Sequence, residues 1–145
     1  MPIRQSYVIC PTMELLHIIG KKWSIPILEE LYYSRAELSF NSISNSLRGA
    51  TQRNLSLSLK ELKRVSLIRK LEKSNGNIRH TAYAITDHGR AIVNTINMIK
   101  KLGTEWYGIN PRCKSFNCAN CEFFADEKCT IMPTEEESEI VIHLK

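Results

Sequence analysis

The feature that most constrains the fold is a helical pattern running from Thr51 to about Val65. Leu55, Leu59 and Leu62 recur at the spacing of one helical face, and the positions between them are mostly polar or basic. A leucine stripe of this kind has to be buried, and the opposite face is left to water or to a ligand. The segment is therefore predicted to be an amphipathic helix with a basic outer face.

A shorter helix is predicted immediately before it. Phe40, Ile43 and Leu47 fall at i, i+3 and i+7, Ser39 is placed to cap the N-terminus, and Gly49 is expected to end the helix. A short helix, a tight turn and a longer polar-faced helix form a helix-turn-helix, whose second helix enters the major groove of DNA by its N-terminus. We therefore predict that five residues of the second helix contact duplex DNA: Thr51, Gln52, Arg53, Ser56 and Lys60.

Residues 12–33 are predicted to form two helices that are broken near Gly20. Thr12 is the expected N-cap of the first, and Pro26 fits the second only if it lies in the first turn. Residues 67–73 and 81–85 alternate with period two on either side of an Asn-Gly turn signal, which predicts a β-hairpin. Its basic residues near the tip are further expected DNA contacts: Lys73, Arg79 and His80.

A long helix is predicted to follow the hairpin, beginning at a cap on Thr86 or Asp87 and reaching Gly103 or beyond. Its apolar stripe is longer than the core of a small domain is expected to cover, so we predict that the stripe packs at a dimer interface. The residues of this stripe are Ile92, Ile96, Ile99 and Trp106. The predicted fold is thus mainly α, with a small β-hairpin wing.

Charge and composition narrow the class of protein. The chain has 145 residues, which suits one domain with a small appendage. Residues 1–110 carry sixteen Lys and Arg against eight Asp and Glu, a basic excess suited to nucleic acid, whereas residues 111–145 carry four against seven. No apolar run is long enough for a membrane helix and no signal peptide precedes the first helix, so a cytoplasmic protein is expected. The chain contains no nucleotide-binding loop or catalytic triad pattern, and we do not expect an enzyme.

Four of the five cysteines fall close together, spaced C-x4-C-x2-C-x7-C, in residues 111–132: Cys113, Cys118, Cys121 and Cys129. Clustered thiols in a reducing compartment favour metal binding over disulfides. The first three cysteines, spaced C-x4-C-x2-C, match plant-type ferredoxins, but the fourth cysteine comes sooner, which suits a compact [4Fe–4S] site. Structural zinc is the alternative, since four-thiolate tetrahedral zinc sites are common. The sequence does not separate the two, and residues 133–145 read as an acidic linker with a terminal strand.

The order of these elements, with five local motifs, resembles the HxlR family of winged-helix transcriptional regulators within the broader MarR-like group. The matching residues are Cys10-Pro11, Gly20-Lys21-Lys22-Trp23, Ile27-Leu28-Glu29-Glu30-Leu31, Thr51-Gln52-Arg53-Asn54-Leu55 with Leu59-Lys60-Glu61-Leu62, and Tyr83-Ala84-Ile85-Thr86-Asp87-His88-Gly89. The resemblance implies a homodimer joined through the first and last helices, which adds Leu16 to the interface, and a palindromic operator. The motifs span roughly residues 10–105, within a predicted DNA-binding and dimerisation domain of residues 1–110, and the cysteine segment lies beyond them.

Cys10 has two interpretations. The resemblance implies a redox switch beside Pro11, and Lys21, Lys22 or the positive end of the first helix would then favour the thiolate. Plain packing of a small apolar residue is the alternative. Combined with the cysteine segment, these observations predict a DNA-binding regulator that responds to redox state, iron or oxygen. The alternatives are the same regulator with structural zinc and, more remotely, an electron-transfer module.

Overall fold

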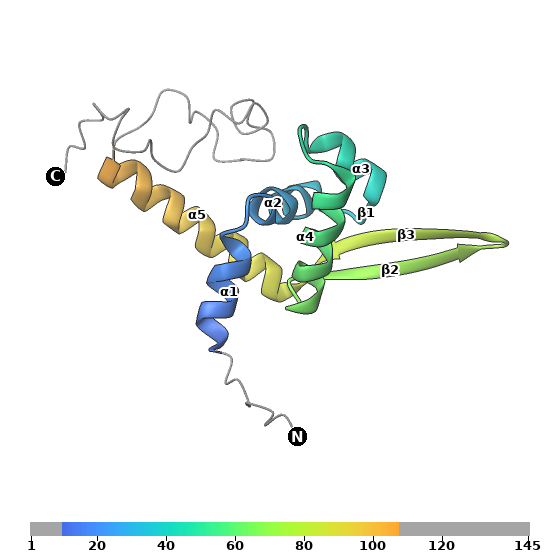
Figure 1. The fold of residues 1–145 in the computed structure, drawn as a ribbon, viewed down its shortest axis with the longest axis horizontal. Coiled ribbons are helices and arrows are strands. Elements are labelled where there is room, and N and C mark those ends of the chain that lie inside the picture. The colour runs from blue at the N-terminus through green and yellow to red at the C-terminus, as the bar shows by residue number, and fades with distance from the viewer. Residues whose placement is uncertain (1–9, 108–145) are drawn as a thin grey trace, which may run out of the picture.

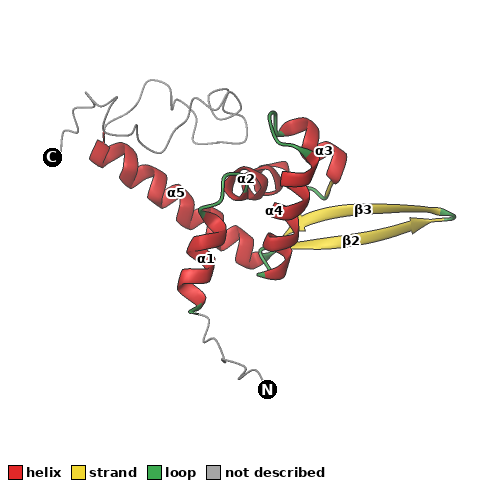
Figure 2. Cartoon of the chain, viewed as in Figure 1, coloured by secondary structure: helices red, strands yellow, loops and turns green. Residues whose placement is uncertain are grey.

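The computed structural model describes residues 10–107, and the predicted elements are present there in the predicted order (Figure 1). The hairpin extends away from one side of a helical body, and the last helix extends from the opposite side (Figure 2). In chain order the elements are α1 (Pro11–Ile19), α2 (Ser24–Ser34), β1 (Leu38–Ser39), α3 (Phe40–Ser46), α4 (Gln52–Arg64), β2 (Ile68–Asn75), β3 (Ile78–Ile85) and α5 (Asp87–Tyr107). This is the winged helix-turn-helix arrangement. The four clustered cysteines lie outside the described residues.

The first two helices meet at a fixed corner. Ser24 is buried and its hydroxyl donates to the Ile18 carbonyl at 2.6 Å, which holds the start of α2 against the end of α1. Pro26 lies in the first turn of α2, as predicted. The prediction for Thr12 was wrong, because α1 begins one residue earlier with Pro11 at its first position and Cys10 as N-cap. A proline is tolerated there because that N–H has no helical partner.

The caps of α3 and α4 confirm the helix-turn-helix. The Ser39 hydroxyl accepts from the Ser42 N–H, and the Thr51 hydroxyl accepts from the Asn54 N–H, both at 3.1 Å. Each cap satisfies one of the unpaired N–H groups at its helix start. The helix α3 ends at Ser46, before Gly49, whose φ of 86° belongs to the turn that follows.

The sheet has three antiparallel strands in the order β1-β3-β2. The two-residue strand β1 was not predicted; it pairs Leu38 with Tyr83. The hairpin turn is shifted one residue from the expected Asn-Gly centre, because Asn75 pairs with Ile78 and leaves Gly76 and Asn77 as the turn. Gly76 has φ 67° in the first turn position, where the turn types that suit right-twisted hairpins require a positive φ.

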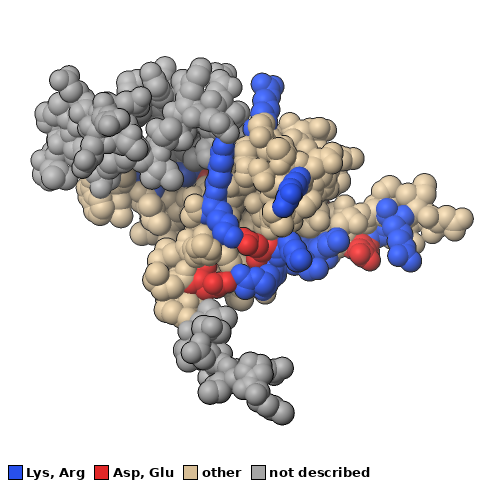
Figure 3. All heavy atoms as spheres, in the orientation of Figure 1, with Lys and Arg blue, Asp and Glu red and all other residues tan. Residues whose placement is uncertain are grey.

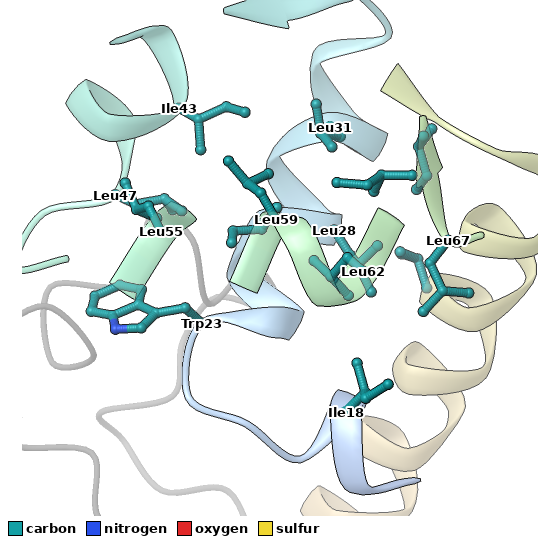
Figure 4. Packing of buried hydrophobic residues seen from close by; sticks show 14 residues of the cluster. Ile18, Trp23, Leu28, Leu31, Ile43, Leu47, Leu55, Leu59, Leu62 and Leu67 are labelled. Carbon is teal, nitrogen blue, oxygen red and sulfur yellow. The ribbon is translucent and has the colours of Figure 1, made fainter. Parts of the chain in front are cut away.

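The core lies where α2 crosses α4, beneath the start of the sheet (Figure 4). The leucine stripe of α4 is buried as predicted, together with Trp23 of the α1–α2 corner. Burial of each such leucine contributes roughly 2 kcal/mol relative to exposure. The buried residues shared among the helices and the sheet are Ile18, Trp23, Ile27, Leu28, Leu31, Ile43, Leu47, Leu55, Leu59, Leu62, Leu67, Ile68, Ile85 and Val93.

The start of α5 is locked against the end of α4. The Thr86 hydroxyl donates to the Ser66 carbonyl at 2.6 Å and accepts from the Gly89 N–H, which confirms Thr86 as the cap. A Cβ on Gly89 would lie 2.1 Å from the Leu67 carbonyl oxygen, so only glycine permits this approach. Within residues 10–107, no helix combines the length and apolar character needed to cross a membrane.

Candidate nucleic-acid interface

The outer face of α4 carries the predicted base-contacting residues. Gln52, Arg53, Ser56 and Lys60 are exposed, and Arg53 and Lys60 lie on the side opposite the buried leucines. Thr51 is exposed as well, and its oxygen is used as the helix cap. A hydroxyl that accepts one hydrogen bond can still donate another, so the cap role does not remove Thr51 from a DNA contact. The helix therefore presents polar side chains from its first two turns to one side of the molecule.

Two ion pairs connect α4 to α1 and to the turn after it. Lys21 donates to both oxygens of Glu61, at 2.6 and 2.7 Å, and Arg64 bonds to Glu14. The hydrogen bond from Arg64 lowers the pKa of Glu14 below its ordinary value of 4.5, outweighing the partial desolvation that raises it. Sequence patterns did not predict these pairs, because the partners are forty and fifty residues apart. Both pairs are partly exposed to solvent, where an ion pair contributes little to stability.

The hairpin divides the three predicted wing residues between two faces. Lys73 is paired directly opposite His80, so these two share a face, whereas Arg79 is opposite Ser74 and lies on the other. All three are exposed, but Lys73 forms an ion pair with Glu37, in the loop between α2 and β1. Lys73 must leave this partner, or share it, in order to reach a phosphate.

Positive charge gathers on the face that includes α4. Figure 3 shows Lys and Arg side chains over α4 and continuing along the hairpin, with a few acidic groups beside them. Three acidic residues, Glu14, Glu37 and Glu61, pair with the basic residues of the ion pairs above. A basic surface that joins a helix-turn-helix to its wing suits the backbone of duplex DNA.

Exposed apolar side chains also lie on α1 and on α5, here called the α1 and α5 surface, and α5 extends beyond the body of the domain (Figure 1). Of the predicted interface residues, Leu16, Ile99 and Trp106 are exposed, the tryptophan by 55%. The sequence prediction missed three further exposed apolar side chains on these two helices: Met13, Met98 and Leu102.

Two residues of the predicted interface lie elsewhere. Ile96 is only 4% exposed and Ile92 packs against the core, so both are used within the single chain. The reason is geometric. The helix α5 extends beyond the body of the domain, so the end of the stripe leaves the core, and the drift of about 20° per heptad around a straight helix adds only a small rotation (Figure 1).

A buried ion pair connects the core to α5. Glu29 of α2 is 0% exposed and bonds to Lys100 of α5. A buried carboxylate is costly unless a cation and hydrogen bonds compensate it. Glu29 was noticed in the sequence only as part of a motif, because nothing in the local pattern indicates that it is buried.

Cys10 is exposed and has a free thiol. Lys21 lies beyond the opposite end of α1, about 13 Å of helix away, and is bound to Glu61, so the predicted proximity of Lys21 to Cys10 was wrong. Among residues 10–107, no three His, Cys, Asp or Glu side chains are grouped closely enough to hold a metal ion. The predicted four-cysteine site lies in the segment outside this range.

Comparison with known proteins identifies similar chains. Residues 18–110 match the model of the HxlR-like helix-turn-helix family. An uncharacterised HTH-type transcriptional regulator of Synechocystis is 28% identical over 105 residues, covering 72% of this chain and 76% of the relative.

Solved structures share the fold. The reduced form of the transcriptional regulator YodB from Bacillus subtilis has a TM-score of 0.59 at 21% identity, covering 68% of this chain and 95% of that one. A possible HxlR family transcriptional factor from Thermoplasma volcanium has a TM-score of 0.53 at 25% identity, with 72% and 94% covered.

Proposed function

Because the chain belongs to the HxlR-like helix-turn-helix family, whose model covers residues 18–110, we propose that it binds a specific palindromic DNA site as a homodimer. It is a transcriptional regulator of this type and not an enzyme. The observation that carries the proposal is the exposed polar face of α4 beside a basic hairpin. The expected base contacts are Gln52, Arg53 and Ser56, with Lys60 and the hairpin on the phosphates.

The proposed dimer rests on the exposed apolar surface of α1 and α5. Met13, Leu16, Ile99, Leu102 and Trp106 would lose contact with water if two copies paired through these helices. Pairing of this kind is isologous and gives the assembly two-fold symmetry. A two-fold dimer places two α4 helices for two half-sites, which is why a palindrome is expected.

Selection from a pool of random duplexes tests the proposal. The full chain should enrich a two-fold symmetric sequence whose half-sites are separated by about one helical turn of DNA. The complex should contain two protein chains per duplex by light scattering. Enrichment of no sequence above the starting pool would contradict the proposed function, and one chain per duplex would contradict the dimer.

We further propose that Cys113, Cys118, Cys121 and Cys129 bind an iron–sulfur cluster, and that the regulator responds to redox state, iron or oxygen. Support comes from the donor set, since four thiolates within seventeen residues supply the soft ligands that a cluster needs. Structural zinc is the competing occupant and uses the same thiolates. The helix α5 ends at Tyr107, shortly before Cys113 in the sequence. A change at the cysteines is therefore expected to affect the proposed dimer surface through this helix.

Anaerobic purification separates the two occupants. A brown protein that contains iron and acid-labile sulfide supports the cluster, and a colourless protein with stoichiometric zinc contradicts it. DNA affinity of the loaded and the metal-free protein then tests the response. Equal affinity in both states would remove the sensing proposal without touching the DNA-binding proposal.

A further inference from the structure

Leu57 is an exposed leucine on the outer face of α4. Its side chain is 52% exposed, and it takes no part in the core cluster. At 100° per residue it lies roughly 170° around the helix from the mean direction of Leu55, Leu59 and Leu62. A single exposed leucine is common on protein surfaces, so its position rather than its exposure carries the inference.

The neighbours of Leu57 on this face are the predicted DNA contacts. Arg53 precedes it by four residues and Lys60 follows it by three, so both lie one turn away on the same side. Together with Ser56 these residues form an i, i+3, i+4, i+7 stripe, the spacing with which one side of a helix faces a groove. Leu57 is the apolar member near the middle of that stripe.

Leu57 also borders a shallow hollow of about 330 Å³ between α4 and the turn before α2. Of the α4 residues that line the hollow, Leu57 lies farthest from the buried stripe, so it forms the outer rim. The wall includes the ion pair between Lys21 and Glu61. Because Leu57 lies at this rim, its side chain remains on the solvent side of α4.

We propose that Leu57 is a specificity-determining residue that contacts the C5-methyl group of a thymine in the major groove. The inference rests on the proposed DNA-binding function and extends it. Thymine is the base that presents a methyl group in that groove, whereas cytosine presents an amino donor that a leucine leaves unpaired. Leu57 therefore favours thymine at a base pair next to the one contacted by Arg53.

The test uses the sequence that the wild-type chain selects from random duplexes. Each thymine of one half-site is replaced in turn by uracil, which removes the methyl group and keeps the hydrogen-bonding edge. For the wild type, at least one replacement should weaken binding roughly fourfold, the equivalent of about 0.8 kcal/mol for one buried methyl-sized group. The Leu57→Ala variant should bind the thymine and uracil forms equally at that position.

Two further variants make the outcome specific. Ser56→Ala changes the same face without removing an apolar contact, so it should keep the uracil penalty. Leu57→Gln exchanges the methyl contact for an amide that pairs with adenine, so its own selected sequence should lose thymine at that position.

A uracil penalty that persists in both Leu57 variants, or no penalty in the wild type, overturns the inference while the selected sequence still supports the proposed function. If the wild type selects no sequence, the proposed function itself fails and the inference fails with it.

Discussion

The two functional surfaces of this small domain expose opposite kinds of side chain. The α4 and hairpin surface is polar and basic, with ion pairs that are open to solvent, such as Lys73 with Glu37. The α1 and α5 surface exposes Met13, Leu16 and Trp106, and the ion pair beside it, Glu29 with Lys100, is buried. Exposed basic side chains suit DNA, because binding to the phosphates releases counterions. Exposed apolar side chains suit a protein partner, because association removes them from water. In the proposed function, the first surface binds DNA and the second binds a copy of the chain.

The largest expected effect comes from charging the apolar surface. Ile99→Glu together with Trp106→Glu should convert the dimer to a monomer, because two carboxylates would be buried in the interface. The monomer reaches one half-site at a time, so affinity for the selected palindrome should fall roughly 100- to 10,000-fold. Analytical ultracentrifugation and electrophoretic shifts measure the two results. Lys101→Glu, an exposed change on the same helix, is the control, and an unchanged dimer in the double variant would refute the assignment of this surface.

The next largest effect concerns the buried ion pair. Lys100→Ala leaves the fully buried Glu29 without its lysine and should lower the free energy of unfolding by about 3 kcal/mol. Urea denaturation measures this change. Replacing both residues by methionine should recover most of the loss, since no charge then remains buried. The neighbouring Lys101→Ala should change the free energy of unfolding by less than about 0.5 kcal/mol, and an equally small change for Lys100→Ala would show that the pair is not needed.

A smaller effect is expected at the hairpin. Glu37→Gln removes the partner of Lys73 and makes that lysine available to a phosphate. DNA affinity should rise a few-fold, and the slope of log affinity against log salt should steepen by about one unit. Titrations at several salt concentrations measure both. If Glu37→Gln raised the affinity equally when Lys73 is also replaced by alanine, the gain would come from the change in net charge alone. Glu72→Gln, on the same hairpin, measures how much affinity the loss of one negative charge adds.

The smallest effect is a pKa change at Glu14. Arg64→Ala should raise the pKa of Glu14 towards 4.5, because the hydrogen bond that favours the carboxylate is lost. Since the pKa is lowered in the folded state, the contribution of the pair to stability is present above the unfolded pKa and is lost as the pH falls through the folded one. A titration followed by NMR measures the shift, and His17→Ala, a weaker neighbour, should raise the pKa less. An unchanged pKa in Arg64→Ala would exclude the pair in solution.

The sequence predicted those features that depend on local spacing. The α4 stripe, the Ser39 and Thr86 caps and the hairpin all follow from patterns within a few residues, whereas the cap role of Thr51 was not predicted. The start of α1 was misplaced because a proline at the first helical position competes with Thr12 as a signal. Strand β1 was missed because two residues are too few to show the alternation of apolar and polar side chains that indicates a strand.

Contacts between segments far apart in the chain could not be predicted from sequence patterns. Glu29 with Lys100 and Lys21 with Glu61 join residues 71 and 40 positions apart, so only the packed structure places them together. The division of the α5 stripe between core and solvent depends mainly on where the domain ends. Leu57 was left out of the buried stripe but was not considered as a DNA contact, because the predicted contacts were chosen among polar and basic residues.

The proposed function depends most on the outer face of α4 contacting DNA bases. The most direct test compares wild type with Gln52→Ala/Arg53→Ala by the ratio of affinity for the selected duplex to affinity for random duplex. The two changes should lower that ratio at least roughly tenfold, since each good bidentate contact is worth about 1–3 kcal/mol of discrimination, while the dimer and its stability stay unchanged. An unaltered ratio would contradict base contact by this face.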